Sequence, residues 1–251
     1  MKLVIIILLM LLGSFLYSQI TYNDSLLQAA KSGDADAQCK LGLCYSKGEG
    51  ILQDKKESVK WFRLSAEQGN AKGQYNLGVA YHFGMGVNKN DKEAIKWIRL
   101  AALQGHPNAQ NNLAAAYNSG EGVKKDVREA FKWYKAAADQ GVAYAQYNLG
   151  EFYDKGEVVT KDFTEAFKWF HLAAEQGDGE AAFVVMVYYY SGKGVIQDKQ
   201  EAYFWGLVGA ANGSQAALMT RNVIEEELTY EEKAIIQDRA KKWLEEHKSE
   251  E

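Results

Sequence analysis

The chain has 251 residues, of which 47% are hydrophobic and 25% charged, a balance typical of a folded globular protein and not of a disordered or fibrous one. Its net charge of -4, with no cluster of Lys and Arg, supplies no basic field for a polyanion, so we expect no nucleic-acid partner. A single proline beside 23 glycines favours many helices that end at glycine.

The N-terminus resembles a secretory signal. Lys2 precedes the apolar run "LVIIILLMLL", which is short for a membrane span, and small Ser18 stands at the expected cleavage point. We therefore expect residues 1–18 to be removed, with no membrane span left and the body exported to the periplasm or the extracellular space. The alternative is a protein anchored in the membrane by an uncleaved N-terminal segment, because Leu16 is large for its position before the cleavage point.

A strict spacing of 36 residues governs the rest of the chain. Glycines and tryptophans keep this step without a slip: Gly33, Gly69, Gly105, Gly141, Gly177 and Gly213, and Trp61, Trp97, Trp133, Trp169 and Trp205. Such a period is the signature of a repeat protein. Five units fill residues 33–213, at 33–68, 69–104, 105–140, 141–176 and 177–213.

Each unit carries the signals of two helices, which we call helix A and helix B. In the first unit Ala37, Leu41 and Tyr45 recur at helical spacing, and this stripe predicts helix A, which ends at a glycine. Asp54 then stands three residues before Glu57, a capping-box pattern that predicts the start of helix B. Helix B ends at "EQG" or a variant of it, where glycine accepts a left-handed conformation.

One such helical hairpin cannot bury both of its apolar faces, whereas stacked hairpins share a continuous core. The predicted fold is therefore all-α: an α-solenoid, or superhelix, of five 36-residue helix-turn-helix repeats with N- and C-terminal capping helices. The segment "SLLQAAKSG" at 25–33 matches only the last part of a helix B, so residues 19–32 are expected to form a capping half-repeat. Residues 214–251 lose the repeat signature and are expected to form capping helices and a tail, with a capping box at Thr229 and Glu232.

The sequence predicts neither a metal nor a cofactor. Cys39 and Cys44 lie five positions apart in one predicted helix, roughly 8 Å along its axis and beyond disulfide reach, so we expect two unpaired, half-buried thiols. The four histidines show no ligand spacing. None of the motifs of serine acylation, metalloproteases or phosphate-binding loops occurs, and we interpret Glu151 and Asp154 as a solvated acidic pair, so no enzyme is predicted.

Several segments carry a resemblance to a known family. They are "AQYNLG" at 145–150, "GMGV" at 84–87, "EAFKWYKAAADQG" at 129–141 and "EAFKWFHLAAEQG" at 165–177. These units resemble the Sel-1-like repeat, a relative of the tetratricopeptide repeat, over about three quarters of the chain. The resemblance implies a scaffold that binds proteins or peptides, often outside the cytoplasm. Secreted relatives with a disulfide in each repeat are linked to β-lactam binding, but this chain lacks those cysteines.

The copies depart from one another at three packing positions. Ala114 and Met186 replace the glycine of the Leu-Gly pair in helix A, and Val158 replaces the second glycine of the "GxG" turn. The sequence does not decide how the helices pack at Ala114 and Met186 or how the chain turns at Val158, but the predicted fold is unchanged.

Function is expected where the copies differ, because shared positions are committed to stacking. If helix A lines the inner curve, as the resemblance implies, the concave groove holds the following candidate partner-binding residues: Tyr75, Val79, His82, Phe83, Asn111, Asn118, Tyr144, Tyr147, Glu151, Asp154, Phe183, Val187 and Tyr190. Aromatic and amide side chains suit the recognition of a polypeptide. Tyr75, Tyr147 and Phe183 have the alternative of packing under the adjacent helix A.

The sequence thus predicts an exported, non-catalytic scaffold or adaptor that binds a protein or an extended peptide in its groove. We expect a monomer without cofactors. The first alternative is recognition of cell-wall glycan or peptidoglycan fragments, whose sugars would stack on the aromatic faces. The second is a β-lactamase-like hydrolase.

Overall fold

The structure is a computed structural model that describes residues 22–247. Within this range the chain forms 13 helices and no strand, which confirms the predicted all-α solenoid. The signal expected at residues 1–18 lies outside the described part. Among the helices of residues 22–247, none combines the length and the apolar character that crossing a membrane requires.

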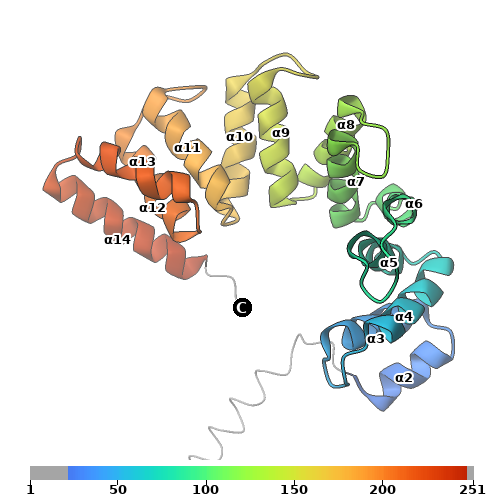
Figure 1. Cartoon of the computed structure of the whole chain (residues 1–251). Coiled ribbons are helices and arrows are strands. Elements are labelled where there is room, and N and C mark those ends of the chain that lie inside the picture. The colour runs from blue at the N-terminus through green and yellow to red at the C-terminus, as the bar shows by residue number, and fades with distance from the viewer. Residues whose placement is uncertain (1–21, 248–251) are drawn as a thin grey trace, which may run out of the picture. The chain divides into compact units, whose positions relative to one another are not determined.

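The helices divide between two compact units (Figure 1). Residues 22–106 hold α2 (Asp24–Lys31), α3 (Ala35–Lys47), α4 (Lys55–Glu67), α5 (Ala71–Phe83) and α6 (Asp91–Leu103). Residues 107–247 hold α7 (Pro107–Ser119), α8 (Val127–Ala138), α9 (Ala143–Lys155), α10 (Phe163–Glu175), α11 (Gly179–Ser191), α12 (Lys199–Ala211), α13 (Gln215–Glu225) and α14 (Tyr230–Glu246).

Helices A and B alternate along the chain as the repeat predicts. The A helices are α3, α5, α7, α9 and α11, and each packs against the B helix that follows it, which is α4, α6, α8, α10 or α12. Within each of the two compact units, a B helix also packs against the A helix of the next repeat, as α4 does on α5 and α10 on α11. The A helices α5, α9 and α11 therefore each lie between two B helices of their own compact unit.

The B helices begin where the Asp or Asn caps predict, but only half of the expected capping box forms. The Asp126 side chain accepts hydrogen bonds from the backbone N–H of Arg128 and Glu129 at 3.0 and 3.1 Å. The Glu129 side chain does not reach back to the cap; it contacts Lys132 at 2.6 Å. Glutamates at the same position in α4, α6 and α10 contact a lysine three residues later in the same way. The capping box predicted at Thr229 is complete.

Paired glutamines tie neighbouring helices together. The buried Gln146 of α9 donates to the backbone carbonyl of Ala138 in α8 at 3.3 Å and accepts from Gln176, at the end of α10, at 2.7 Å. The pairs Gln38 with Gln68, Gln74 with Gln104 and Gln110 with Gln140 have the same 2.7 Å bond. The fifth repeat has Ala182 and Asn212 instead, so both partners change together. The glutamine of "EQG" is therefore retained for this contact.

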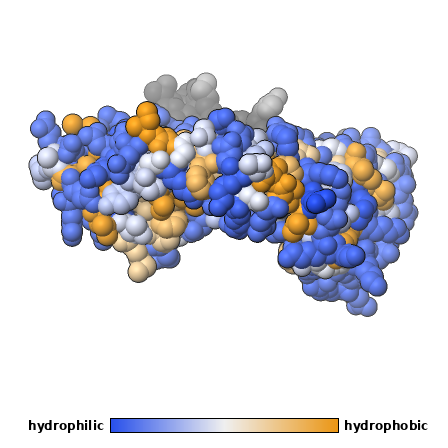
Figure 2. Space-filling model, turned by 90° about the horizontal axis from the view of Figure 1, so that it is seen from above, coloured by the Kyte–Doolittle hydropathy of each residue, from blue (hydrophilic) through white to orange (hydrophobic). Residues whose placement is uncertain are grey.

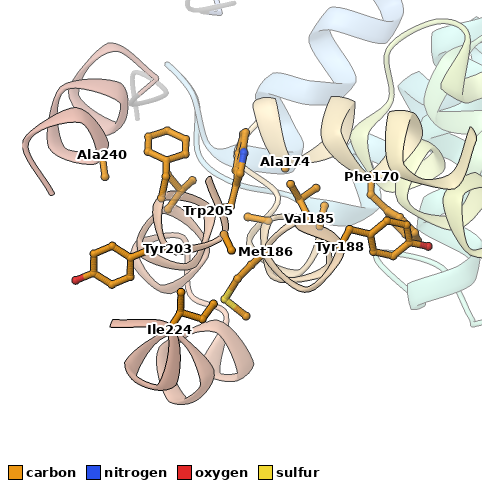
Figure 3. Close-up of a cluster of buried hydrophobic side chains, with 14 of the residues drawn as sticks. Phe170, Ala174, Val185, Met186, Tyr188, Tyr203, Trp205, Ile224 and Ala240 are labelled. Atoms are coloured by element: carbon orange, nitrogen blue, oxygen red, sulfur yellow. The ribbon is translucent and has the colours of Figure 1, made fainter. Parts of the chain in front are cut away.

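The A and B helices of a repeat meet at one small and one large residue. A Cβ atom added to Gly150 would lie 2.9 Å from ring carbons of Phe170, so a larger residue has no room there. The fifth repeat reverses the two sizes: Met186 occupies the glycine position, and Gly206 faces it, with an added Cβ 2.9 Å from the methionine sulfur. Figure 3 shows the Met186 side chain directed toward Ile224. The departure noted at Met186 is thus compensated by its partner.

The "GxG" turns approach the preceding B helix closely. A Cβ atom added to Gly194 would lie 2.3 Å from the carbonyl oxygen of Phe163, and the left-handed φ of +70° there also favours glycine. The fourth repeat turns differently at Val158, because no residue other than glycine has a positive φ among residues 22–247.

The C-terminal helix α14 covers α12. Trp243 packs edge-on against Trp205 at a centroid distance of 5.8 Å, and Arg239 forms a bidentate ion pair with Glu201. Trp205 is therefore buried, whereas Trp133 at the same position of the third repeat is only partly buried. The last repeat is closed by this contact.

The two cysteines are free, as predicted, but their environment differs from the prediction. Cys39 and Cys44 are buried rather than half-buried, with exposed fractions of 2% and 0%. Burial raises the pKa of both thiols, which favours the neutral form.

Candidate functional site

Retained and varying positions of the A helices have opposite environments. The leucines of the Leu-Gly pair, Leu41, Leu77, Leu113 and Leu149, are completely buried. The first varying position is exposed in all five copies, at Asp36, Lys72, Asn108, Tyr144 and Glu180. Cys39 is the exception among the varying positions because it is buried. Within each of the two compact units, we call the surface formed by the varying positions of its A helices the A-helix face.

In residues 22–106 the candidates lie on α5. Tyr75 is partly buried and stacks on His106, with ring centroids 4.6 Å apart, and Val79 is partly buried. Nδ1 of His82 lies 3.0 Å from a carboxylate oxygen of Asp91. Phe83 is exposed beside His82. These four candidates therefore lie in a different unit from the rest.

Four candidates of residues 107–247 lie on α7, α9 and α11, and one of them, Asn118, lines a small cavity together with Glu151. Asn111 is partly buried and donates to Asn112 at 3.3 Å, and Asn118 is exposed. Tyr144 is 56% exposed on the first turn of α9. The hydroxyl of Tyr190 donates to Glu227 at 2.6 Å, so this aromatic residue joins the end of α11 to the segment after α13.

The remaining five candidates line one cavity of about 210 Å³ between α9 and α11, which also reaches α10. They are Tyr147, Glu151, Asp154, Phe183 and Val187. The other lining residues are Lys155, Phe170, Val184, Tyr188 and Lys193. We call this cavity the α9–α11 pocket. Tyr147 and Phe183 pack on the core, as the alternative interpretation of the sequence expects, and they also line this cavity.

Asp154 organises the polar end of the α9–α11 pocket. Its carboxylate accepts a hydrogen bond from the hydroxyl of Tyr188 and lies 2.5 Å from Nζ of Lys193. Partial burial works to raise the pKa of Asp154, but the hydrogen bonds from Lys193 and Tyr188 outweigh it and hold that pKa below its ordinary value. Asp154 is thus a fixed carboxylate at neutral pH.

The other charged groups of the pocket are also paired. Glu151 contacts Lys155 one turn later on α9 at 3.1 Å. Lys193 lies over the rings of Phe163 and Tyr188, at 4.4 and 4.8 Å from their centroids. The pocket therefore combines an apolar interior with two ion pairs at its edge.

Sequence reasoning missed Phe170, Val184, Tyr188 and Lys193. Lys193 carried a signal, because the middle residue of the "GxG" turn is Glu49, Met85, Glu121 or Glu157 in the other copies and basic only here. Phe170 and Tyr188 are buried side chains whose rings face the cavity from the core. No pattern in the sequence separates them from ordinary packing residues.

Comparison with known proteins identifies the repeat. A family model described as the Sel1 repeat matches residues 35–70, 71–106, 107–142, 143–178 and 181–214. Each matched segment holds one A helix and one B helix. No curated protein matches the chain.

Two solved structures are similar in sequence and in fold. A Sel1 repeat protein from Oxalobacter formigenes is 32% identical, with a TM-score of 0.72, and the match covers 84% of this chain and 89% of that one. A protective antigen of uropathogenic Escherichia coli strains, which displays an SLR fold, is 37% identical, with a TM-score of 0.73 over 78% of this chain. This chain spans only 42% of the antigen's length.

Proposed function

The chain belongs to the Sel1 repeat family, whose members are typically non-catalytic scaffolds for protein interactions, and from this premise we propose that it binds a polypeptide through the A-helix face. The bound polypeptide is a protein surface or an extended segment. The whole set of candidate residues from Tyr75 to Tyr190 remains part of this proposal.

The observation that supports this proposal is that each A helix has buried positions that are retained among the repeats and exposed positions that vary. Buried leucines and small residues that face the B helix are the same in most copies, whereas the exposed positions change in size and charge from copy to copy. A surface that varies while its framework is retained is free to match one partner. The α9–α11 pocket adds a concave apolar feature to that surface, of the kind that anchors interface side chains.

Figure 2 shows one face of the molecule, which is largely hydrophilic with apolar residues in small separate patches. A partner that bound the face shown there would combine polar contacts with a few apolar anchors, as in ordinary non-obligate interfaces.

Site-specific photo-crosslinking in the cells that produce the protein tests the proposal. A photoreactive phenylalanine analogue replaces Tyr144 on the A-helix face or, as a matched control, Leu172 on helix B, which is 40% exposed. We expect protease-sensitive adducts from position 144 and none from position 172. Adducts that resist protease but yield to a glycan hydrolase would favour glycan recognition. Equal adducts from both positions would contradict a dedicated A-helix face.

We also propose that the protein acts outside the cytoplasm. The lone Lys2 before the run "LVIIILLMLL" and the small Ser18 support export with cleavage after residue 18. Fractionation of the producing cells, followed by N-terminal sequencing, tests this proposal. A mature chain that begins at Gln19 is the expected result, and an intact N-terminus in the membrane fraction would favour the anchored alternative.

A further inference from the structure

We propose that the α9–α11 pocket is an anchor site for one large apolar side chain of a basic peptide segment. This proposal rests on the polypeptide-binding function proposed above and adds the chemistry of the partner.

The size of the pocket fits a single side chain. Its volume of about 210 Å³ is below the roughly 300–1,000 Å³ of pockets that enclose a whole small-molecule ligand. It exceeds the roughly 150 Å³ of an apolar cavity that accepts a benzene ring. A phenylalanine, leucine or methionine side chain from a bound segment therefore fits, while the backbone of that segment stays outside.

The apolar part of the pocket is held in place before any partner arrives. Phe170 is 3% exposed in the core, and the ring of Tyr147 packs edge-on against it at a centroid distance of 5.4 Å. Phe183 and Val184 pack against the same core cluster. Because these side chains are already ordered, binding costs them little conformational entropy, which is the property of an anchor pocket.

The unit that holds the pocket is acidic, although the charged residues that line the pocket itself are two carboxylates and two lysines. Residues 107–247 contain 22 Asp and Glu against 15 Lys and Arg. At the pocket itself, burial raises the pKa of the Tyr147 hydroxyl, and the nearby carboxylates of Glu151, Glu180 and Asp178 raise it further. Glu180 is exposed on the first turn of α11.

Each lysine of the pocket offsets one of its two carboxylates, so the excess negative charge beside the pocket comes from Asp178 and Glu180 near Tyr147. Lys155 is paired with Glu151, and Lys193 with Asp154. Residues that flank an inserted apolar side chain therefore meet carboxylates, and complementary charge favours lysine or arginine at those places. An acidic segment would be repelled by the same groups.

Fluorescence anisotropy with three labelled peptides of equal length tests this inference on the full mature chain. The first has one phenylalanine between two pairs of lysines. The second has alanine in place of the phenylalanine, and the third has glutamates in place of the lysines. We expect the alanine peptide to bind at least about tenfold more weakly, because it buries less apolar surface. We expect the glutamate peptide to be weaker at low salt, by a factor that shrinks as salt screens the exposed charges.

Two protein variants locate the binding. Val187→Asn places a polar amide at the mouth of the pocket, where Val187 is 37% exposed, without adding charge, and is expected to weaken the phenylalanine peptide about tenfold. Ile196→Asn makes the same change in the turn after α11, outside the pocket, and is expected to leave affinity unchanged. Thermal melts check the fold, and the milder Val187→Thr replaces Val187→Asn if the latter melts early.

Equal binding of the phenylalanine and alanine peptides would overturn the anchor, since only charge attraction would remain. Unchanged affinity in the Val187 variant would overturn its location, and a glutamate peptide that binds as well as the lysine peptide would overturn the charge argument. Absence of binding by all three peptides at millimolar concentration would overturn the pocket as a peptide site. Protease-sensitive adducts at position 144 would still support the broader proposed function in that case.

Discussion

Exchanging the large and small partners of the fourth repeat tests how the hairpins pack. We consider Gly150→Met, Phe170→Gly and the double variant, which copies the arrangement of Met186 and Gly206 in the fifth repeat. The Gly150→Met substitution alone would make the new side chain overlap the Phe170 ring, because even a Cβ atom would lie 2.9 Å from it. Such overpacking costs about 1–3 kcal/mol of unfolding free energy.

Removing the Phe170 ring empties a site that is 3% exposed. Truncation of a buried phenylalanine costs about 3–5 kcal/mol, and glycine inside a helix adds about 1 kcal/mol. Independent effects would therefore sum to about 5–9 kcal/mol. In the double variant the methionine occupies the emptied space, so we expect the loss to be smaller than that sum by a favourable coupling of up to about 3 kcal/mol.

Urea unfolding of the four proteins, followed by circular dichroism, measures the coupling. The matched control combines Gly150→Met with Phe62→Gly, the equivalent aromatic of the first repeat, and should be additive because Phe62 packs against Gly42 and Gly150 against Phe170. A double variant whose loss equals the sum of the single losses would refute the reasoning. It would mean that the reversed sizes in the fifth repeat do not compensate each other.

Three other substitutions probe a core tryptophan, a helix cap and an ion pair. Trp205→Ala should cost about 3–5 kcal/mol and Trp133→Ala less, because only Trp205 is fully buried; urea melts showing the reverse order would contradict this. Asp126→Ala should cost about 1 kcal/mol through loss of a helix cap, with partner binding unchanged in the same preparation. Although partial burial opposes it, the hydrogen bond from Lys193 lowers the pKa of Asp154 in the folded protein. The ionised Asp154 therefore contributes its full stabilisation above about pH 4, and this contribution is lost as the pH falls further. Asp154→Asn should flatten the loss of stability measured in an acid titration, and an unaltered curve would count against the ion pair.

The fold was predictable because the same local signals occur five times. The 36-residue step of the tryptophans and the cap at Asp126 locate the helices without any knowledge of their packing. The compensation between Met186 and Gly206 was not predictable, because the two positions lie on different helices and only their contact reveals why both depart. The glutamine pairs were missed for the same reason.

The candidate site was predicted in part. Varying positions on helix A correctly pointed to exposed residues such as Tyr144, but Cys39 satisfies the same criterion and is buried. The α9–α11 pocket depends on the depth to which Phe170 and Tyr188 reach from the core and on Lys193 from a turn. How far a side chain reaches into a cavity depends on tertiary packing, and the repeat pattern of the sequence does not reveal that packing.

Methyl NMR of the full chain most directly tests the claim that varying positions of the A helices bind a polypeptide. Spectra of Val- and Leu-labelled protein are compared with and without the polypeptide recovered by crosslinking at position 144. The account predicts shift changes at Val184 and Val187 in the α9–α11 pocket, with Leu64, Leu100 and Leu172 on the B helices unaffected. Changes confined to the B-helix leucines, with the pocket valines unmoved, would contradict it.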